Sequence, residues 1–443
     1  MRDIALALFV FGTIPYILTR PYVGLLVWSW LGYMNPHRLC YGFAVSFPWV
    51  QLIAVVALVS LAFSKESKRI PVSSITVLLI LFFAWTTFTT FFAVETASAW
   101  QWWAQFGKIL IMVWMTLMLV NSRQRMQLLV WVIVISLGFY GLKGGIFTVL
   151  KGGASHIFGP TGSFIADNND LAQALCMVLP LMRYLQLQSR NKYVRLALVL
   201  TMMLTGVAIL GTYSRGGLVA LAAVSGALFL KSRGRIAVIA VFAVLGYTAY
   251  HFMPAQWTQR MDTLQNTEQV NSFQTRVESW KFATNVALDR PLVGGGFNVY
   301  ESTQMWMRYG PEDAKPRAVH SIYFRVLGEQ GFPGLAIFLA LLLASWRSCS
   351  RVRRETRDSL EQRWAYDLGS MLQVSLVAFM IAGLATTSSY FDLSYQLMAM
   401  CALLWLIVSS QPITSVVHGS HTTASSKTAV NGAMAMQRNE YRR

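Results

Sequence analysis

Charged side chains are scarce in this chain of 443 residues, where Asp, Glu, Lys and Arg together make up 13%. A soluble protein of this length carries about twice that fraction, roughly a quarter of its residues. Apolar side chains instead make up 55%, and the mean hydropathy is +0.47. The composition excludes an ordinary soluble globular protein and indicates a membrane protein.

Several familiar catalytic and metal-binding patterns are missing as well. The sequence has no Walker A motif, so nucleotide hydrolysis is not indicated. It has no D-x-D or H-E-x-x-H pattern, and its four cysteines are scattered, so neither a metal site nor a disulfide framework is predicted. We therefore expect no cofactor and no metal.

Long apolar runs are abundant by contrast. A membrane helix needs about 20 apolar residues, and runs near that length recur at 4–18, 22–34, 45–63, 72–93, 104–120, 128–149, 170–188, 196–212, 216–230, 236–253, 333–346, 367–386 and 395–410. The first two form either two helices or one broken helix, and the first runs into Thr-Arg-Pro rather than a signal-peptide cleavage site. The runs predict an all-α polytopic integral membrane protein with about twelve transmembrane helices.

The net charge of +18 is concentrated in short linkers between these runs. The basic linkers are residues 64–69, 121–125, 188–195, 231–235 and 347–363. By the positive-inside rule they face the cytoplasm, so the charge sets topology and contacts anionic lipid rather than nucleic acid. Both chain ends are then expected in the cytoplasm, and the outward connections are 94–106, 148–169, 213–215, 254–320 and 387–394.

This topology divides the chain into four parts. Residues 1–253 hold transmembrane helices 1–10 with short loops, 254–320 form one long periplasmic loop, 321–410 hold an interfacial helix and the last transmembrane helices, and 411–443 form a disordered cytoplasmic tail. A long loop rich in aromatic and charged residues is more often a functional cap than a spacer. Its stretch SFQTRVESWKFATNVALD has apolar residues at helical spacing before Pro291, so we expect short helices in the loop.

His320 ends the long loop and precedes an apolar segment punctuated by Gly331, Pro333 and Gly334. We interpret this segment as a short interfacial helix with His320 near its first turn. A helix N-terminus disfavours a cationic imidazole, so His320 would stay neutral, as a general base requires. The alternative is a histidine that caps the helix or lies among lipid headgroups.

Arg215 lies in the stretch GTYSRGG, which joins two apolar runs through a tight outward turn. A cation on this side runs against the positive-inside trend, and ionisable residues at membrane depth are usually functional. Guanidinium suits phosphate oxygens, and the following glycines let a ligand approach the backbone. The alternative is an arginine that snorkels to phospholipid phosphate.

A third pattern is GPTGSFIADNNDLAQAL at 159–175. Asn168, Asn169 and Asp170 directly precede an apolar helix, which suits an N-cap, and contact with sugar is the alternative. Lys143 in GLKGG is another cation at an outward helix end that either meets an anion or snorkels.

These motifs together resemble the O-antigen ligase and polymerase superfamily of bacterial envelope glycosyltransferases, over residues 130–345. The shared features are the asparagine motif, the S-R-G-G turn, an R-x-E-x-W…P-x-x-G-x-G pattern, and a histidine followed by a helix and G-x-x-G-L. The last two occur here as Arg276, Glu278, Trp280, Pro291, Gly294, Gly296, His320, Gly331, Gly334 and Leu335. The first hundred residues resemble putative O-glycosylation ligases associated with exosortases.

The resemblance implies a GT-C-like fold in the bacterial inner membrane with an active site facing the periplasm. It also implies a glycan donor on undecaprenyl pyrophosphate and, for a ligase, the lipid A–core of lipopolysaccharide as acceptor. In such an inverting, metal-independent reaction, His320 would be the base, and Arg215 and Arg276 would stabilise charge on the leaving pyrophosphate. A polymerase, a protein O-oligosaccharyltransferase and, outside this class, a lipid or solute transporter are the alternatives.

Other residues are candidates for supporting roles. Lys143, Lys281, Arg308, Arg317 and Arg325 are candidates to bind phosphate or sugar, as are Asn168 and Asn169. Trp280 either stacks on sugar or packs the loop, and Glu278 is a candidate to orient either Arg276 or His320, between which the sequence does not choose. The three glycines at 294–296 predict a tight turn. Besides the two substrates, the expected partners are membrane lipids and not nucleic acid.

Overall fold

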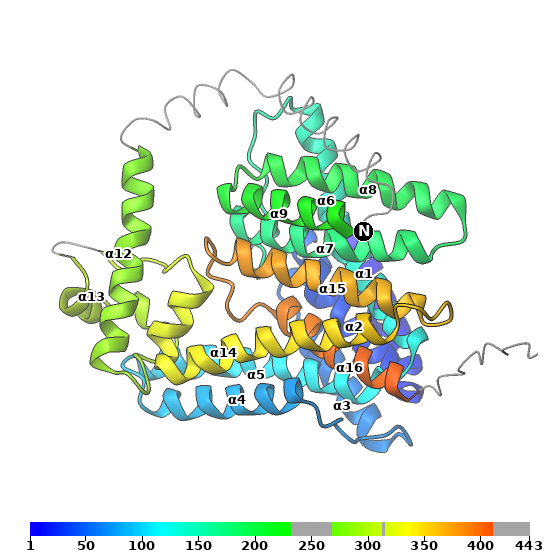
Figure 1. Ribbon diagram of the computed structural model, residues 1–443, viewed down its shortest axis with the longest axis horizontal. Coiled ribbons are helices and arrows are strands. Elements are labelled where there is room, and N and C mark those ends of the chain that lie inside the picture. The colour runs from blue at the N-terminus through cyan, green and yellow to red at the C-terminus, as the bar shows by residue number, and fades with distance from the viewer. Residues whose placement is uncertain (232–267, 312–314, 411–443) are drawn as a thin grey trace, which may run out of the picture. The chain divides into compact units, whose positions relative to one another are not determined.

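The computed structural model describes residues 1–231, 268–311 and 315–410, and within these ranges the regular elements are helices, with no strand (Figure 1). The α-helices are α1 (Arg2–Thr19), α2 (Pro21–Met34), α3 (Trp49–Phe63), α4 (Ser74–Phe91), α5 (Thr96–Leu119), α6 (Arg123–Leu150), α7 (Asn168–Gln188), α8 (Lys192–Gly211), α9 (Arg215–Lys231), α12 (Glu268–Asp289), α13 (Thr303–Tyr309), α14 (Ile322–Glu355), α15 (Arg363–Ala382) and α16 (Asp392–Ser409). Short 3₁₀ turns lie at Pro36–Leu39, Phe43–Val45 and Val299–Glu301. The fold is that of an all-helical, multi-pass membrane protein, as predicted.

Eight of these helices are long and apolar enough to span a bilayer, namely α1, α4, α5, α6, α8, α14, α15 and α16. The helices α2, α3 and α9 have 14, 15 and 17 residues, which is below the length of a full span. The predicted run at 236–253 and the tail at 411–443 lie outside the described residues. The described part of the chain therefore supplies eight candidate spans rather than the expected twelve.

The first two apolar runs form two antiparallel helices that meet at Arg20, which removes the alternative of one broken helix. At one end of α1, the Asp3 carboxylate accepts hydrogen bonds from the backbone of Gly42 and Ala44. At the other end, Ser60 donates to the carbonyl of Ile17 near the basic linker 64–69. The N-terminal end of α1 therefore lies at the opposite end of this helix from the basic linker 64–69.

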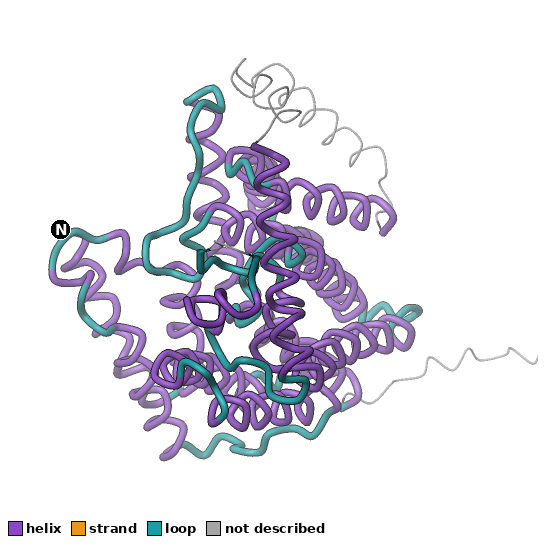
Figure 2. Tube along the Cα trace, turned by 90° about the vertical axis from the view of Figure 1, so that its left-hand side faces the viewer, coloured by secondary structure: helices purple, strands orange, loops and turns teal. Residues whose placement is uncertain are grey.

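The predicted helical stretch of the long loop is α12, which ends at Asp289, just before Pro291. It lies with α13 beside the start of α14, at one end of the bundle (Figures 1 and 2). Helix α14 is interrupted at Gly331, whose φ of 68° and ψ of −174° are not helical. This break separates a short first segment from the membrane helix, as the glycine and proline residues predict.

The three glycines at 294–296 form the expected tight turn and also hold it against the first segment of α14. Gly294 and Gly296 have φ values of 63° and 83°. The backbone N–H groups of Gly295 and Gly296 donate to the carbonyls of Gly328 and Glu329 at 2.8 and 2.9 Å. A Cβ atom on Gly296 would lie 2.2 Å from that of Ala93, so only glycine fits here.

Candidate active site

His320 lies between the first turn of α14 and the cap, which is formed by α12, α13 and the loops that follow them up to residue 319. Its backbone adopts φ 48°, a left-handed conformation that is uncommon for any residue except glycine. Ser321 is the N-cap of α14, and the Ile322 N–H donates to the Gly383 carbonyl at 2.8 Å, which ties this corner to the end of α15. The imidazole is half-buried at this corner, so its orientation is set by the tertiary fold.

Two charged residues act on His320 with opposite sign. Burial lowers the pKa of His320, the positive charge of Arg276 lowers it further, and the negative charge of Asp167 raises it. The net effect is a pKa below the ordinary value of 6.5. The imidazole is therefore neutral near neutral pH and able to accept a proton. The neutral state was expected from a helix N-terminus, but burial and Arg276 are its causes.

Arg215 is the first residue of α9, and its side chain is exposed. Its positive charge lowers the pKa of Arg276, after the larger effect of burial. The SRGG turn thus lies close to α12, far away in sequence. Two neighbouring guanidinium groups repel each other, and a bound polyanion such as pyrophosphate would remove that cost.

The asparagine motif holds the SRGG turn in place. The Asn168 amide donates to the carbonyl of Thr212 at 2.9 Å, and the Ser214 hydroxyl donates to the side-chain oxygen of Asn169 at 2.8 Å. The N-cap of α7 is Asp167, whose carboxylate accepts from the Asn169 N–H at 2.8 Å. The expectation that the asparagines cap the helix is wrong by one residue, because they are already in its first turn.

Asp167 is the residue that sequence reasoning missed. The sequence signal was available, since an aspartate directly before Asn168 is a strong N-cap candidate. Its action on His320 was not visible, because the two residues lie more than 150 positions apart and meet only through the fold.

Trp280 packs against the segment that carries His320. Its ring stacks on Phe324 with centroids 5.2 Å apart, and its indole N–H donates to the carbonyl of Val319 at 3.1 Å. Of the two alternatives for Trp280, stacking on sugar or packing the loop, the structure shows packing. Trp280 thereby fixes the residues on either side of His320.

The remaining predicted cations have other partners or positions. Arg317 forms an ion pair of 3.2 Å with Glu278, so Glu278 is engaged there rather than with His320. Arg308 pairs with Asp289 at 3.5 Å on the exposed side of the cap. Lys143 on α6 and Lys281 on α12 are exposed, and no contact of the described residues brings either to His320.

Arg325 is buried beneath the site rather than open to a ligand. Its guanidinium forms an ion pair of 3.1 Å with Glu329 and donates to the carbonyl of Thr387. It also lies 5.0–5.1 Å from the centroids of the Trp102, Tyr300 and Tyr390 rings. The Glu329 carboxylate accepts from the backbone N–H of Asn298 at 3.0 Å. This pair joins the cap to the membrane helices, which is a structural role.

The three residues that meet here, Arg215, Arg276 and His320, all lie in one segment that matches a known family. Residues 200–339 match the model described as O-antigen ligase. The resemblance to the O-antigen ligase superfamily is confirmed. Residues 1–212 match the model of a family of unknown function (DUF5935). No curated protein matches the chain. The match over residues 200–339 supports a ligase- or polymerase-type glycosyltransferase acting on lipid-linked glycan in a membrane.

Proposed function

We propose that this protein is an O-antigen ligase of the bacterial inner membrane. It transfers a glycan from undecaprenyl pyrophosphate to a hydroxyl of lipid A–core on the periplasmic face. The observation that carries this proposal is the convergence of His320, Arg276 and Arg215, which come from the loop before α14, from α12 and from the start of α9. A neutral imidazole next to two guanidinium groups fits a reaction that removes a proton and releases a polyanion.

In the proposed mechanism, the His320 imidazole accepts the proton of the acceptor hydroxyl. The hydroxyl oxygen forms a bond to the anomeric carbon, while the bond from that carbon to the pyrophosphate oxygen breaks. The electron pair of the broken bond stays on the pyrophosphate, where Arg215 and Arg276 stabilise the developing charge. Direct displacement inverts the anomeric centre. Because pyrophosphate is already a good leaving group, the proposed reaction needs no metal.

The supporting residues position these groups. Asn168 and Asn169 hold the turn that presents Arg215, and Trp280 holds the segment around His320. Lys143 and Arg308 remain candidates for contacts to a long glycan, because both are exposed, whereas Arg317 is half-buried and paired with Glu278.

Reconstitution tests the proposal. Purified full-length protein is incubated with undecaprenyl-pyrophosphate glycan, with and without lipid A–core and with a chelator, and products are analysed by gel and mass spectrometry. We expect glycan on lipid A–core, and the His320→Ala variant should lose about 10²–10⁴-fold in rate while still binding donor. Full turnover in His320→Ala would exclude the base role.

The second candidate function is polymerisation, because the superfamily contains both activities. Longer lipid-linked chains formed in the absence of lipid A–core would establish a polymerase and replace the ligase proposal. The three residues would then keep their roles with a different acceptor. Glycan attached to protein instead would favour the O-oligosaccharyltransferase suggested by the N-terminal resemblance.

A further inference from the structure

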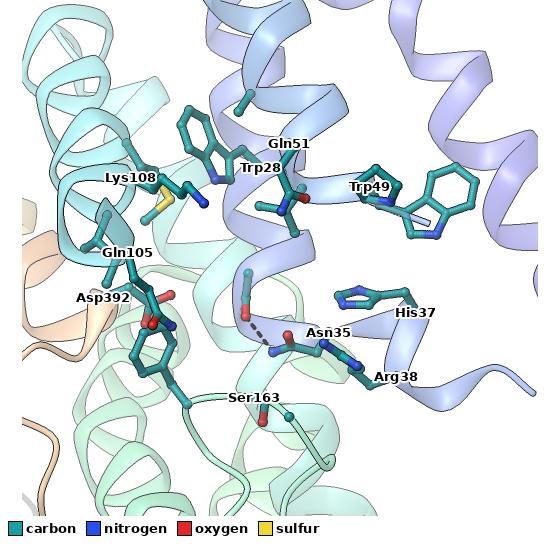
Figure 3. Close-up of a pocket in the computed structure, with 18 of the residues that line it drawn as sticks. Trp28, Asn35, His37, Arg38, Trp49, Gln51, Gln105, Lys108, Ser163 and Asp392 are labelled. Carbon is teal, nitrogen blue, oxygen red and sulfur yellow. Dashed lines mark hydrogen bonds between the residues drawn. The ribbon is translucent and has the colours of Figure 1, made fainter. Parts of the chain in front are cut away.

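A separate cavity of about 780 Å³ lies in the N-terminal part of the chain (Figure 3). Its walls are the end of α2 and the loop after it, residues 49–58 of α3, residues 101–112 of α5, and the loop at 162–164. All of its lining residues except Asp392 belong to the segment that matches the family of unknown function. A cavity of this size accommodates a small ligand or a lipid headgroup.

In the cavity, polar side chains on one face of α5 lie opposite a wall of α3 that is mostly apolar. Gln101, Gln105 and Lys108 line it from one face of α5, at spacings that place them on successive turns. Opposite them, Gln51 lines it near the start of α3, and the next turns contribute apolar Val55 and Leu58. In Figure 3, Lys108 and Gln105 face Gln51 across the space. Val55 is 59% exposed, so this apolar wall continues onto the lipid-facing surface. Such a gradient fits an amphiphile.

The charges of the lining favour an anion. Lys108 and Arg38 line the cavity, and neither forms an ion pair with any residue of the described ranges. Burial, and then the charge of Arg38, lowers the pKa of His37 to about 4, so His37 is neutral. The one acid in the lining, Asp392, is buried and accepts from the Leu393 N–H at 2.8 Å. Lys108 is exposed on the apolar helix α5, where an anion such as phosphate would pair with its charge.

A polar atom inside the lining also lacks a partner. His37 is only 7% exposed, and its Nδ1 atom has no hydrogen-bond partner among the described residues. Amide side chains, a partnerless imidazole nitrogen and the aromatic rings of Trp102 and Phe164 are the groups that bind sugar hydroxyls and sugar faces. The lining therefore offers contacts for sugar as well as for phosphate.

The cavity adjoins the candidate active site through two shared elements. Trp102 lines the cavity and also lies 5.0 Å from the Arg325 guanidinium, below the first turn of α14. Phe164 lines it three residues before Asp167, whose charge acts on His320. A ligand held in the cavity thus lies beside the loop that reaches the base.

We propose that this cavity binds the acceptor, as a membrane glycolipid whose sugar headgroup carries phosphate. The proposal rests on the proposed ligase function and adds the acceptor site to it. Lys108 and Arg38 hold the phosphate, the amide side chains and Trp102 hold the sugars, and the acyl chains extend past Val55 into the bilayer.

Binding measurements on a variant without turnover test this site directly. The His320→Ala protein in detergent is titrated with three probes: lipid A–core, the same glycolipid with its phosphates removed, and undecaprenyl phosphate. Adding Lys108→Met, which removes the charge and keeps an unbranched side chain of similar length, should weaken lipid A–core binding by about tenfold. It should leave the other two probes unchanged. Lys151→Met, an exposed lysine outside the cavity, is the matched control and should change nothing.

Two results would overturn the proposal. Unchanged lipid A–core affinity in both Lys108→Met and Arg38→Gln would mean that the cavity is not a ligand site. Loss of undecaprenyl phosphate binding alone would assign the cavity to the donor lipid. If lipid A–core binds with Lys108 dependence but wild-type protein transfers no glycan to it, the glycolipid site is supported and the ligase reaction is rejected.

Discussion

Ser214 and Asn169 are joined by a hydrogen bond of 2.8 Å between their side-chain oxygens, and this bond ties the turn before α9 to the start of α7. Arg215 directly follows Ser214, and Asp167 lies two residues before Asn169. The bond therefore fixes the position of Asp167, whose charge acts on His320, relative to Arg215, whose charge acts on Arg276.

This bond should contribute to catalysis by positioning rather than by contact with substrate. Asn169→Ala and Ser214→Ala should each lower kcat with little change in the thermal unfolding temperature in detergent. Because both remove the same bond, the double variant should lose less than the sum of the single losses in ΔΔG‡. Fully additive losses would show that the two residues act independently.

The acidic side of the pH–rate profile should report the His320 pKa. In the proposed mechanism the neutral imidazole is the active form, so the rate should rise with pH through a pKa below 6.5 and then reach a plateau. Asp167 raises that pKa, so Asp167→Asn, which retains an N-cap oxygen, should move the acidic limb to lower pH. Arg276→Gln lowers the rate but should move the limb of the residual activity to higher pH. Shifts in the same direction for both variants would exclude this account.

Arginine and lysine at position 215 should bind pyrophosphate with different affinity. Arg215→Ala should lower kcat/KM for donor by about 10²-fold, as expected when one charged donor to a developing anion is lost. Arg215→Lys should recover only part of this, because an ammonium cannot contact two phosphate oxygens as a planar fork does. Unchanged activity in Arg215→Ala would favour the alternative of snorkelling to phospholipid. Arg123→Ala is the control, because Arg123 is the first residue of α6 and lies outside the site.

The buried Arg325–Glu329 pair should determine stability rather than chemistry. Removing one partner leaves an uncompensated buried charge, so Arg325→Met should destabilise the protein by about 3–5 kcal/mol. The double variant Arg325→Met/Glu329→Leu should recover much of that loss, because no charge is then left buried. Thermal unfolding in detergent measures both. Equal destabilisation of the single and double variants would argue against a paired role.

Much of the fold could be predicted because a bilayer imposes a simple rule. Each apolar run of sufficient length must become a helix, and α12 was predictable from its spacing and from Pro291 as its stop. The direction of α1 could not be predicted, because two short helices that meet at Arg20 and one broken helix have the same apolar composition.

The candidate site could be predicted only in part. His320, Arg215 and Arg276 stood out as polar residues in distinctive surroundings, and the structure brings them together. Trp280, Arg317 and Arg325 stood out for similar reasons, yet they contact Val319, Glu278 and Glu329. Lys108 attracted no attention, since one lysine in an apolar run is easily interpreted as a snorkelling residue.

The sequence by itself determined that the chain is helical, lies in a membrane and resembles the O-antigen ligase superfamily, because these properties follow from local composition and short motifs. Tertiary structure alone decided which polar side chains are free for substrate and which are already paired. The physical reason is that a charge becomes available or is neutralised through neighbours far along the chain. Asp167 beside His320 and Glu329 beside Arg325 and Asn298 are the examples here.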